Sequence, residues 1–159
     1  MPKMVTCLWF DGQAEEAAAH YTAIFPRSEV FGVTRYGPDM PGSEGSVMVV
    51  NFSLDGQHFV GLNGGPQFPF TEAISFQIFC ADQEEVDYYW SRLTEDGKEG
   101  PCGWLKDRYG VSWQVVPTRL IELLDDPDPG RAYRATQAMM SMGKIEIAEV
   151  VRAADQVPA

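Results

Sequence analysis

Positive charge is scarce in this sequence of 159 residues, which has 12 lysines and arginines against 23 aspartates and glutamates and a net charge of −11. Proteins that bind nucleic acids or anionic membranes obtain much of their affinity from lysine and arginine side chains. We therefore expect neither nucleic acid nor a membrane among the partners. Hydrophobic residues make up 45% of the chain, which excludes the disordered class and predicts one globular domain over residues 1–159.

Cysteine and histidine are also scarce. The three cysteines, Cys7, Cys80 and Cys102, are widely spaced and form no CxxC motif, and the only histidines are His20 and His58. Zinc fingers need closely spaced cysteine and histidine pairs, and disulfide frameworks need several paired cysteines. The sequence excludes the first pattern and argues against the second.

Long apolar runs are missing as well. The apolar stretch at residues 5–10 is short, turns polar at Asp11 and has no small-residue cleavage site. A membrane span needs about 20 apolar residues, and a signal peptide needs an apolar core followed by a cleavage site. We therefore expect a cytoplasmic protein without a signal peptide or a transmembrane span.

The first part of the chain predicts the order βαβββ. Pro26 ends a helix in which apolar residues recur three and four positions apart, and Asp55-Gly56 is a strong hairpin signal between two strands. The predicted elements lie at residues 5–10, 14–25, 29–36, 46–54 and 57–62.

The same order recurs after a loop rich in glycine and proline. A shift of 69 residues sets Gln13 beside Asp82, and a shift of 54 sets Phe59 beside Trp113. The repeat predicts a first module at residues 1–63 and a second at 71–117. The second set of elements is predicted at residues 73–80, 82–93, 98–102, 104–106 and 111–116.

A helical extension is predicted over residues 118–159. Its helices are expected at residues 118–124, 131–142 and 144–154, with a break at 125–130. Met139, Met140 and Met142 cluster in this extension and predict a packing or subunit surface, because methionine suits adaptable contacts.

Five segments of the chain resemble the PhnB-like proteins, many of which carry the name 3-demethylubiquinone-9 3-methyltransferase-like. This family belongs to the vicinal oxygen chelate superfamily, with glyoxalase I, bleomycin-resistance proteins and extradiol dioxygenases. The segments are residues 8–17 (LWFDGQAEEA), 62–66 (LNGGP), 73–77 (AISFQ), 86–90 (VDYYW) and 102–117 (CGWLKDRYGVSWQVVP).

The resemblance implies an α+β fold in which two tandem βαβββ modules form a paired half-barrel around a cleft. Proteins of this superfamily commonly form dimers. The resemblance also implies metal ligands, usually His and Glu, on the first and last strand of each module. The corresponding positions in this chain are Thr6, Val60, Ser75 and Gln114. These side chains supply weak donors or none, whereas a divalent cation needs carboxylate, imidazole or thiolate ligands. A metal is therefore disfavoured, and we predict no cofactor.

The methyltransferase name does not match a recognisable cofactor site in the sequence. A nucleotide-type cofactor is typically held at a glycine-rich turn between a strand and a helix. The closest glycine pair, Gly64-Gly65, is followed by Pro66 and a loop. We therefore treat the name as one transmitted by similarity.

Several residues have both a functional and a structural interpretation. Gln114 and Ser75 could hydrogen-bond a ligand in the cleft, or they could be polar groups satisfied inside the barrel. His58 could serve as an acid or base, or lie at the surface beside a turn. Arg35 could receive an anionic ligand at the mouth of the cleft, or be an exposed arginine before a loop. Cys102 could be activated by nearby basic side chains, or be buried and inert.

Three hypotheses for function remain. The first is a small-molecule-binding protein that uses the cleft without a metal, and its candidate ligand-binding residues are Thr6, Arg35, His58, Val60, Ser75 and Gln114. The second is an enzyme, either a metal-dependent glyoxalase or dioxygenase type with displaced ligands, or a 3-demethylubiquinone-9 3-methyltransferase-like transferase. The third is a structural or interaction protein. The sequence assigns no catalytic residue, and aromatic side chains favour an aromatic or apolar ligand. A homodimer is expected.

Overall fold

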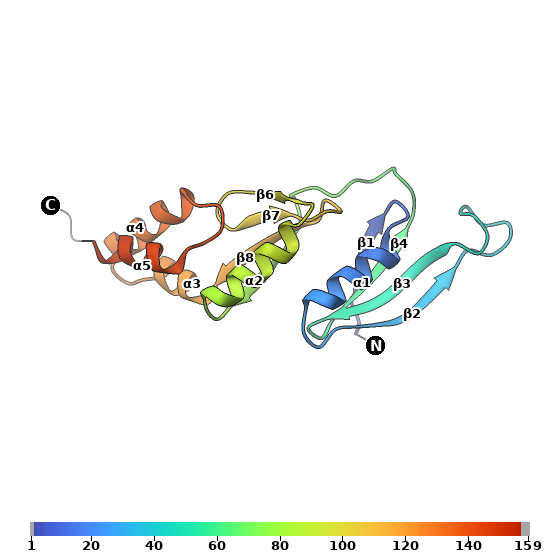
Figure 1. The fold of residues 1–159 in the computed structure, drawn as a ribbon, viewed down its shortest axis with the longest axis horizontal. Helices are drawn as coiled ribbons and strands as arrows, with labels where there is room; N and C mark the ends of the chain where they lie inside the picture. The colour runs from blue at the N-terminus through green and yellow to red at the C-terminus, as the bar shows by residue number, and fades with distance from the viewer. Residues whose placement is uncertain (1, 157–159) are drawn as a thin grey trace. The chain divides into compact units, whose positions relative to one another are not determined.

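The computed structural model describes residues 2–156 and confirms an α+β architecture of two four-stranded sheets with helices (Figure 1). The chain divides into two compact units, Met1–Phe70 and Thr71–Ala159. Each unit contains one βαβββ module, so the repeat predicted from the sequence is confirmed. None of the helices in the described part is long and apolar enough to cross a membrane.

The first unit forms a sheet with the strand order β1-β4-β3-β2. β1 and β4 are parallel neighbours, and the other two pairs are antiparallel. The elements are β1 (Thr6–Phe10), α1 (Ala14–Ile24), β2 (Glu29–Arg35), β3 (Val47–Leu54) and β4 (Gln57–Asn63).

Helix α1 packs closely on this sheet because the residues in contact, on both the helix and the strand, are small. Ala14 and Ala17 are fully buried, and a Cβ placed on Gly61 of β4 would lie 3.1 Å from the Cβ of Ala14. The backbone N–H of Ala14 donates to the side-chain oxygen of Asn63 at 2.9 Å, which fixes the helix start to the end of β4.

The second unit repeats this topology with the strand order β5-β8-β7-β6. β5 and β8 are parallel, and the hairpin strands are antiparallel. The elements are β5 (Ser75–Cys80), α2 (Gln83–Thr94), β6 (Lys98–Glu99), β7 (Trp104–Lys106) and β8 (Ser112–Pro117). The strand predicted at residues 98–102 has only two residues, because Cys102 and Gly103 have left-handed backbone angles (φ 58° and 81°) and turn the chain.

Three helices follow β8: α3 (Thr118–Leu124), α4 (Pro129–Met140) and α5 (Ile147–Asp155). The predicted start of α4 at residue 131 is two residues late, because Pro129 takes the first helical position and the Asp128 carboxylate accepts from the Gly130 N–H at 2.9 Å. Met139 and Met142 pack against the core of the extension, whereas Met140 is 60% exposed. That core consists of Leu120, Leu123, Ala135, Ile145, Val150 and Ala154.

The segment between α4 and α5 binds to the rest of the second unit through its backbone. The N–H groups of Cys102 and Gly103 donate to the carbonyls of Met142 and Gly143, both at 2.8 Å. The last helix therefore begins at Ile147 and not at residue 144 as predicted, since the residues before it make these contacts outside any helix.

The same segment is also held by the start of α2. The Gln83 side chain donates to the Ile145 carbonyl at 3.0 Å and accepts from the Ile147 N–H at 2.8 Å. Lys144 forms an ion pair with Asp87 at 2.8 Å, which lowers the pKa of Asp87 and raises that of Lys144. The extension is therefore an integral part of the second unit.

Candidate functional site

The second sheet has one face packed under α2 and one face with polar side chains. Alternation along β5 and β8 directs Phe76, Ile78, Trp113 and Val115 towards the helix, where Ile78, Trp113 and Val115 are buried. We call the opposite set the polar face. It consists of Ser75, Gln77, Trp104, Lys106, Ser112 and Gln114, with Phe79 and Val116 as an apolar pair at its end.

A short chain of hydrogen bonds crosses the polar face. The Gln114 amide nitrogen donates to the Ser75 hydroxyl at 2.8 Å, and the Gln77 amide nitrogen donates to the Gln114 oxygen at 3.3 Å. The structure thus brings together Ser75 and Gln114, which the sequence predicted as candidates. Both ends of the Gln114 amide already have protein partners, so this pair fixes the centre of the face.

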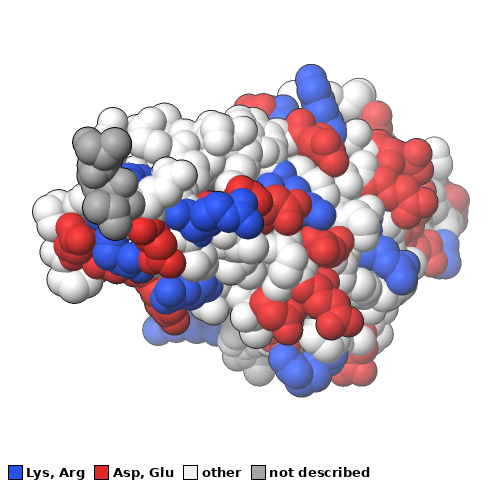
Figure 2. Space-filling model, turned by 60° about the vertical axis from the view of Figure 1, so that its left-hand side comes forward, with Lys and Arg blue, Asp and Glu red and all other residues white. Residues whose placement is uncertain are grey.

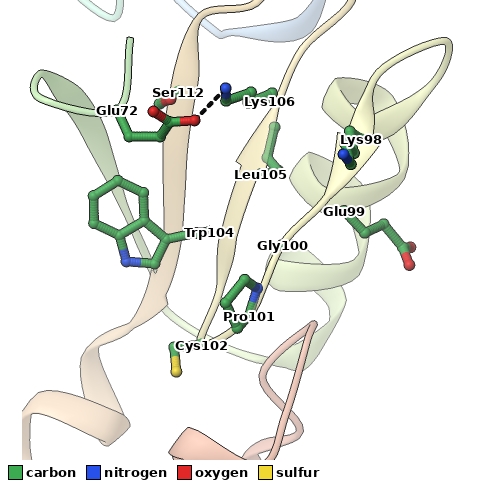
Figure 3. Close-up of a pocket in the computed structure, with 10 residues that line it drawn as sticks. All are labelled: Glu72, Lys98, Glu99, Gly100, Pro101, Cys102, Trp104, Leu105, Lys106 and Ser112. Atoms are coloured by element: carbon green, nitrogen blue, oxygen red, sulfur yellow. Dashed lines mark ion pairs between the residues drawn. The ribbon is translucent and has the colours of Figure 1, made fainter.

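Beside these residues lies a pocket of about 540 Å³. Figure 3 shows that its wall is the β6–β7 hairpin with the turn between these strands, and that Glu72 approaches from the segment before β5. The lining residues are Glu72, Lys98, Glu99, Gly100, Pro101, Cys102, Trp104, Leu105, Lys106 and Ser112.

The charged groups of this pocket are unequally paired. The Lys106 ammonium forms an ion pair with the Glu72 carboxylate and lowers the pKa of Glu72 below its ordinary value. Lys98 lies directly opposite Lys106 in the β6–β7 pairing and has no ion pair within residues 2–156. The Glu99 carboxylate accepts from the Trp90 indole N–H of α2 at 2.9 Å and is directed away from Trp104 (Figure 3). Lys98 is therefore the charged residue of the lining without an ion pair or a hydrogen bond among residues 2–156, although the lining as a whole has two lysines and two glutamates.

Ser112 is the most buried polar group of the pocket, with 1% of its surface exposed. Its hydroxyl oxygen has no hydrogen-bond partner within the described part of the chain. A buried hydroxyl without a partner costs about 1–3 kcal/mol, so native structures pair nearly all such groups. The sequence did not single out Ser112, although it lies two residues before Gln114 and hence on the same face.

Thr6 lies on the face of the first sheet that α1 covers. β1 and β4 pair so that Thr6 is opposite Phe59 and Cys7 is opposite Val60. Directly paired residues point to the same face, and Phe59 belongs to the buried core. The prediction that Thr6 shares a face with Val60, as the counterpart of Ser75, is therefore wrong by one residue.

The other candidates of the first unit do not converge on one site. His58 lies on the same face as Val60 and stacks on Phe31, with ring centroids 5.1 Å apart. The Arg35 guanidinium is exposed and donates to the Gly45 carbonyl at 3.1 Å. These contacts support structural roles for both residues.

The Gly64-Gly65 pair accommodates a tryptophan side chain. A Cβ on Gly64 would lie 2.2 Å from the Trp9 ring, and the Trp9 indole N–H donates to the Gly65 carbonyl at 2.9 Å. A second pocket of about 480 Å³ lies beside this pair, with Tyr36 and Asn63 in its wall. The glycines are explained by packing, and no helix follows them to hold a phosphate.

The cysteines have different environments. Cys80 is buried, and burial raises the pKa of its thiol to about 12, with smaller effects from Glu85 and Asp82. A thiol in this state is a poor nucleophile. Cys102 is half-buried and lines the pocket, whereas Cys7 is exposed.

The residues at the implied ligand positions do not fit a divalent metal. Thr6 lies under the helix, Val60 has no donor atom, and the Ser75 and Gln114 side chains are hydrogen-bonded to each other. Among residues 2–156, no group of three or more histidine, cysteine, aspartate or glutamate side chains could hold a metal ion.

Lysines and arginines are interspersed with acidic side chains on the face of the molecule shown in Figure 2. Ion pairs of this kind include Arg119–Glu122 and Arg152–Glu149 in the extension. The pocket of the second unit differs, because Lys98 and Lys106 lie opposite each other there, and of the two only Lys106 forms an ion pair among residues 2–156, with Glu72.

Comparisons with known proteins agree with the fold. The model of the 3-demethylubiquinone-9 3-methyltransferase family matches residues 2–116. A PhnB protein from Bacillus cereus, named for the same activity, is 38% identical with a TM-score of 0.66, over 73% of this chain and 99% of that one. A search of curated proteins gave no match.

Two more distant structures share the fold. A protein from Pseudomonas aeruginosa is 19% identical with a TM-score of 0.60, over 74% of this chain and 98% of its own. The fosfomycin resistance protein FosX from Listeria monocytogenes, solved with Mn(II) and sulfate, is 20% identical with a TM-score of 0.50. The match covers 72% of this chain and 92% of FosX. The family match ends at residue 116, so helices α3 to α5 lie beyond it.

Proposed function

Because the chain belongs to the PhnB-like, 3-demethylubiquinone-9 3-methyltransferase family of the vicinal oxygen chelate superfamily, we propose that it binds a small molecule in the pocket of its second unit without a bound metal. The pocket volume suits a ligand of one or two rings. Trp104 offers an aromatic surface to such a ligand, and Lys106 and Ser112 offer polar contacts.

One observation supports this proposal above the others, namely the unpartnered hydroxyl of Ser112 in the pocket wall. The hydroxyl oxygen is closed to solvent in this structure, so a ligand contacts it only after a neighbouring side chain, such as Glu72 beside it in Figure 3, has moved. A ligand that does so supplies the missing hydrogen bond, and its binding recovers the free energy that burial of the hydroxyl costs.

The alternative is an enzyme, either metal-dependent or a methyltransferase. The Mn(II) in the FosX structure belongs to that protein, and the ligand positions of this chain do not fit a divalent cation. The glycine pair that could hold a nucleotide is occupied by Trp9. The binding hypothesis therefore has more support. Homodimerisation and a cytoplasmic location stay predictions.

The experiment is a thermal-shift screen of EDTA-treated protein against aromatic and anionic metabolites, with S-adenosylmethionine included. We expect at least one aromatic compound to raise the melting temperature, since a ligand that binds only the native state stabilises it. Binding that depends on added Zn²⁺, Ni²⁺ or Fe²⁺, or a shift with S-adenosylmethionine alone, would contradict metal-free binding and favour the enzyme alternative.

Ser75 and Ser112 provide a matched pair for this screen, because they lie opposite each other across β5 and β8. Ser112→Ala removes an unpartnered hydroxyl, so we expect an unchanged or higher melting temperature and about tenfold weaker binding of the ligand found. Ser75→Ala removes an acceptor of Gln114 and should lower the melting temperature. Equal binding by wild type and Ser112→Ala would contradict the proposed site.

A further inference from the structure

The charges around the pocket indicate the chemical class of the ligand, if the proposed function is correct. Lys98 and Lys106 face each other across β6 and β7, although like charges in directly opposite positions destabilise a sheet. This arrangement occurs in a chain with nearly twice as many acidic as basic residues. An anion between the lysines removes the repulsion, so the arrangement favours a bound anion.

Glu72 already provides an internal carboxylate for Lys106, from the side of β7 that is away from Lys98 (Figure 3). It forms the ion pair with Lys106 from an exposed segment before β5, and its side chain is 61% exposed. Exposed ion pairs contribute at most about 1 kcal/mol, because water solvates both partners and the flexible side chains lose conformational entropy. A ligand carboxylate with further contacts in the pocket can therefore replace Glu72 at modest cost.

Trp104 and Ser112 supply those further contacts. Trp104 and Lys106 alternate on β7 and so point to one face, on which Ser112 pairs with Lys106 from β8. The Ser112 hydroxyl can donate to a carboxylate, and the Trp104 ring can pack against an apolar body. The site thus combines a cation, a hydroxyl donor and an aromatic ring on neighbouring strands.

We propose that the pocket of the second unit binds an aromatic carboxylate, whose carboxyl group displaces Glu72 from Lys106 and reaches the Ser112 hydroxyl. Glu72 then competes with the ligand within the chain. This inference rests on the proposed function, to which it adds the ligand class and an internal competitor.

The probes are 2-naphthoate and its neutral amide, 2-naphthamide, which have the same rings and differ in the group that would meet Lys106. Dissociation constants are measured by calorimetry on the whole chain, and amide shifts in ¹⁵N spectra locate the site. We expect 2-naphthoate to bind about tenfold more tightly than 2-naphthamide. The shifts should concentrate at Gly100, Lys106 and Ser112.

Two substitutions test the roles of the charged residues. Lys106→Met should abolish the preference for the carboxylate, while Lys3→Met, at an exposed lysine of the first unit, should preserve it. Glu72→Gln removes the competitor and should tighten 2-naphthoate binding about threefold to tenfold without changing 2-naphthamide. Glu44→Gln, an exposed residue of the first unit, serves as its control.

The possible outcomes separate the two levels of the proposal. Equal binding of both probes at the pocket overturns the carboxylate inference and supports the proposed binding function. Loss of the preference in Lys106→Met, together with tighter binding in Glu72→Gln, supports both. Binding of neither probe, or shifts confined to the first unit, overturns the inference and argues against the pocket as the binding site.

Discussion

The two units of this protein share one order of elements and differ in the side chains on the sheet face that points away from the helix. In the first unit this face has Trp9, Val60 and Leu62, with Trp9 packed edge-on against Phe68 and with Asn51 and His58 as polar members. In the second unit the corresponding face has hydroxyl and amide groups, including Ser75 and Gln114. One backbone pattern thus supports a different mixture of apolar and polar side chains in each copy, so the fold alone does not determine the site.

The turns before the last strand of each module, β4 and β8, also differ, because one turn is exposed and the other contains a buried carboxylate. In the first unit the Asp55-Gly56 hairpin is exposed, and Asp55 forms an ion pair with Arg27. In the second unit Asp107 is 3% exposed and accepts from three groups, at 2.9 to 3.0 Å. The donors are the N–H groups of Tyr109 and Val111 and the indole N–H of Trp113. The second unit therefore depends on one buried carboxylate for the position of β8.

The largest expected effect is the difference in stability between two variants, in each of which one of these aspartates is replaced by asparagine. Asp107→Asn keeps the shape of the side chain but replaces a charged acceptor by an amide, whose nitrogen then faces a donor. We therefore expect a loss on the order of 3 kcal/mol in the free energy of unfolding. Asp55→Asn should cost less than about 1 kcal/mol, because its ion pair is exposed. Urea unfolding followed by tryptophan fluorescence measures both. Similar losses in the two variants would contradict the comparison.

A smaller effect is expected at the starts of the two helices. Gln83→Ala should cost about 1–2 kcal/mol, because its amide joins the backbone of Ile145 and Ile147 to α2. Gln13→Ala is the matched control before α1, where the Gln13 side chain makes no cap hydrogen bond. Hydrogen exchange of residues 142–147 should accelerate only in Gln83→Ala. Unchanged exchange there would show that the core of the extension holds this segment without Gln83.

The smallest effect concerns pH and the Lys144–Asp87 ion pair. Because the bond from Lys144 lowers the pKa of Asp87 in the folded state, the pair stabilises fully above the unfolded value of about 3.9 and less as the pH falls through the lowered pKa. Lys144→Met should lower the melting temperature by about 1–2 °C at pH 7, since the pair is partly exposed.

This difference should shrink as the pH falls through the lowered pKa of Asp87, because a protonated Asp87 no longer forms the ion pair. Arg27→Met, which removes the more exposed ion pair of the first unit, should change the melting temperature less. A difference between wild type and Lys144→Met that is independent of pH would mean that packing of the lysine stem, and not its charge, stabilises the segment.

Much of the fold could be predicted from the sequence, because turn residues and apolar spacing mark the elements locally. Asp55-Gly56 identified its hairpin, and α3 was predicted with its exact bounds. Register was harder. Thr6 pairs with Phe59 as Phe76 pairs with Trp113, so Thr6 corresponds to Phe76 and not to Ser75. A slip of one residue leaves the pattern of strands unchanged but exchanges the two faces.

The candidate site could be predicted only in part. Ser75 and Gln114 were found because strand alternation and the resemblance both place them on one face. Ser112 was missed because its distinguishing property is an unmade hydrogen bond, which depends on every neighbouring side chain. The contact between the Cys102–Gly103 turn and Met142 was missed for a related reason, since backbone pairing between distant segments leaves no residue pattern.

The contact of the extension with that turn also has a consequence for the order in which the protein forms during synthesis. All strands of the first sheet lie within residues 6–63, so that sheet can close while later residues are still being added by the ribosome. The N–H groups of Cys102 and Gly103 obtain their acceptors only when residues 142 and 143 have emerged. The wall of the pocket is therefore among the last parts of the protein to be completed.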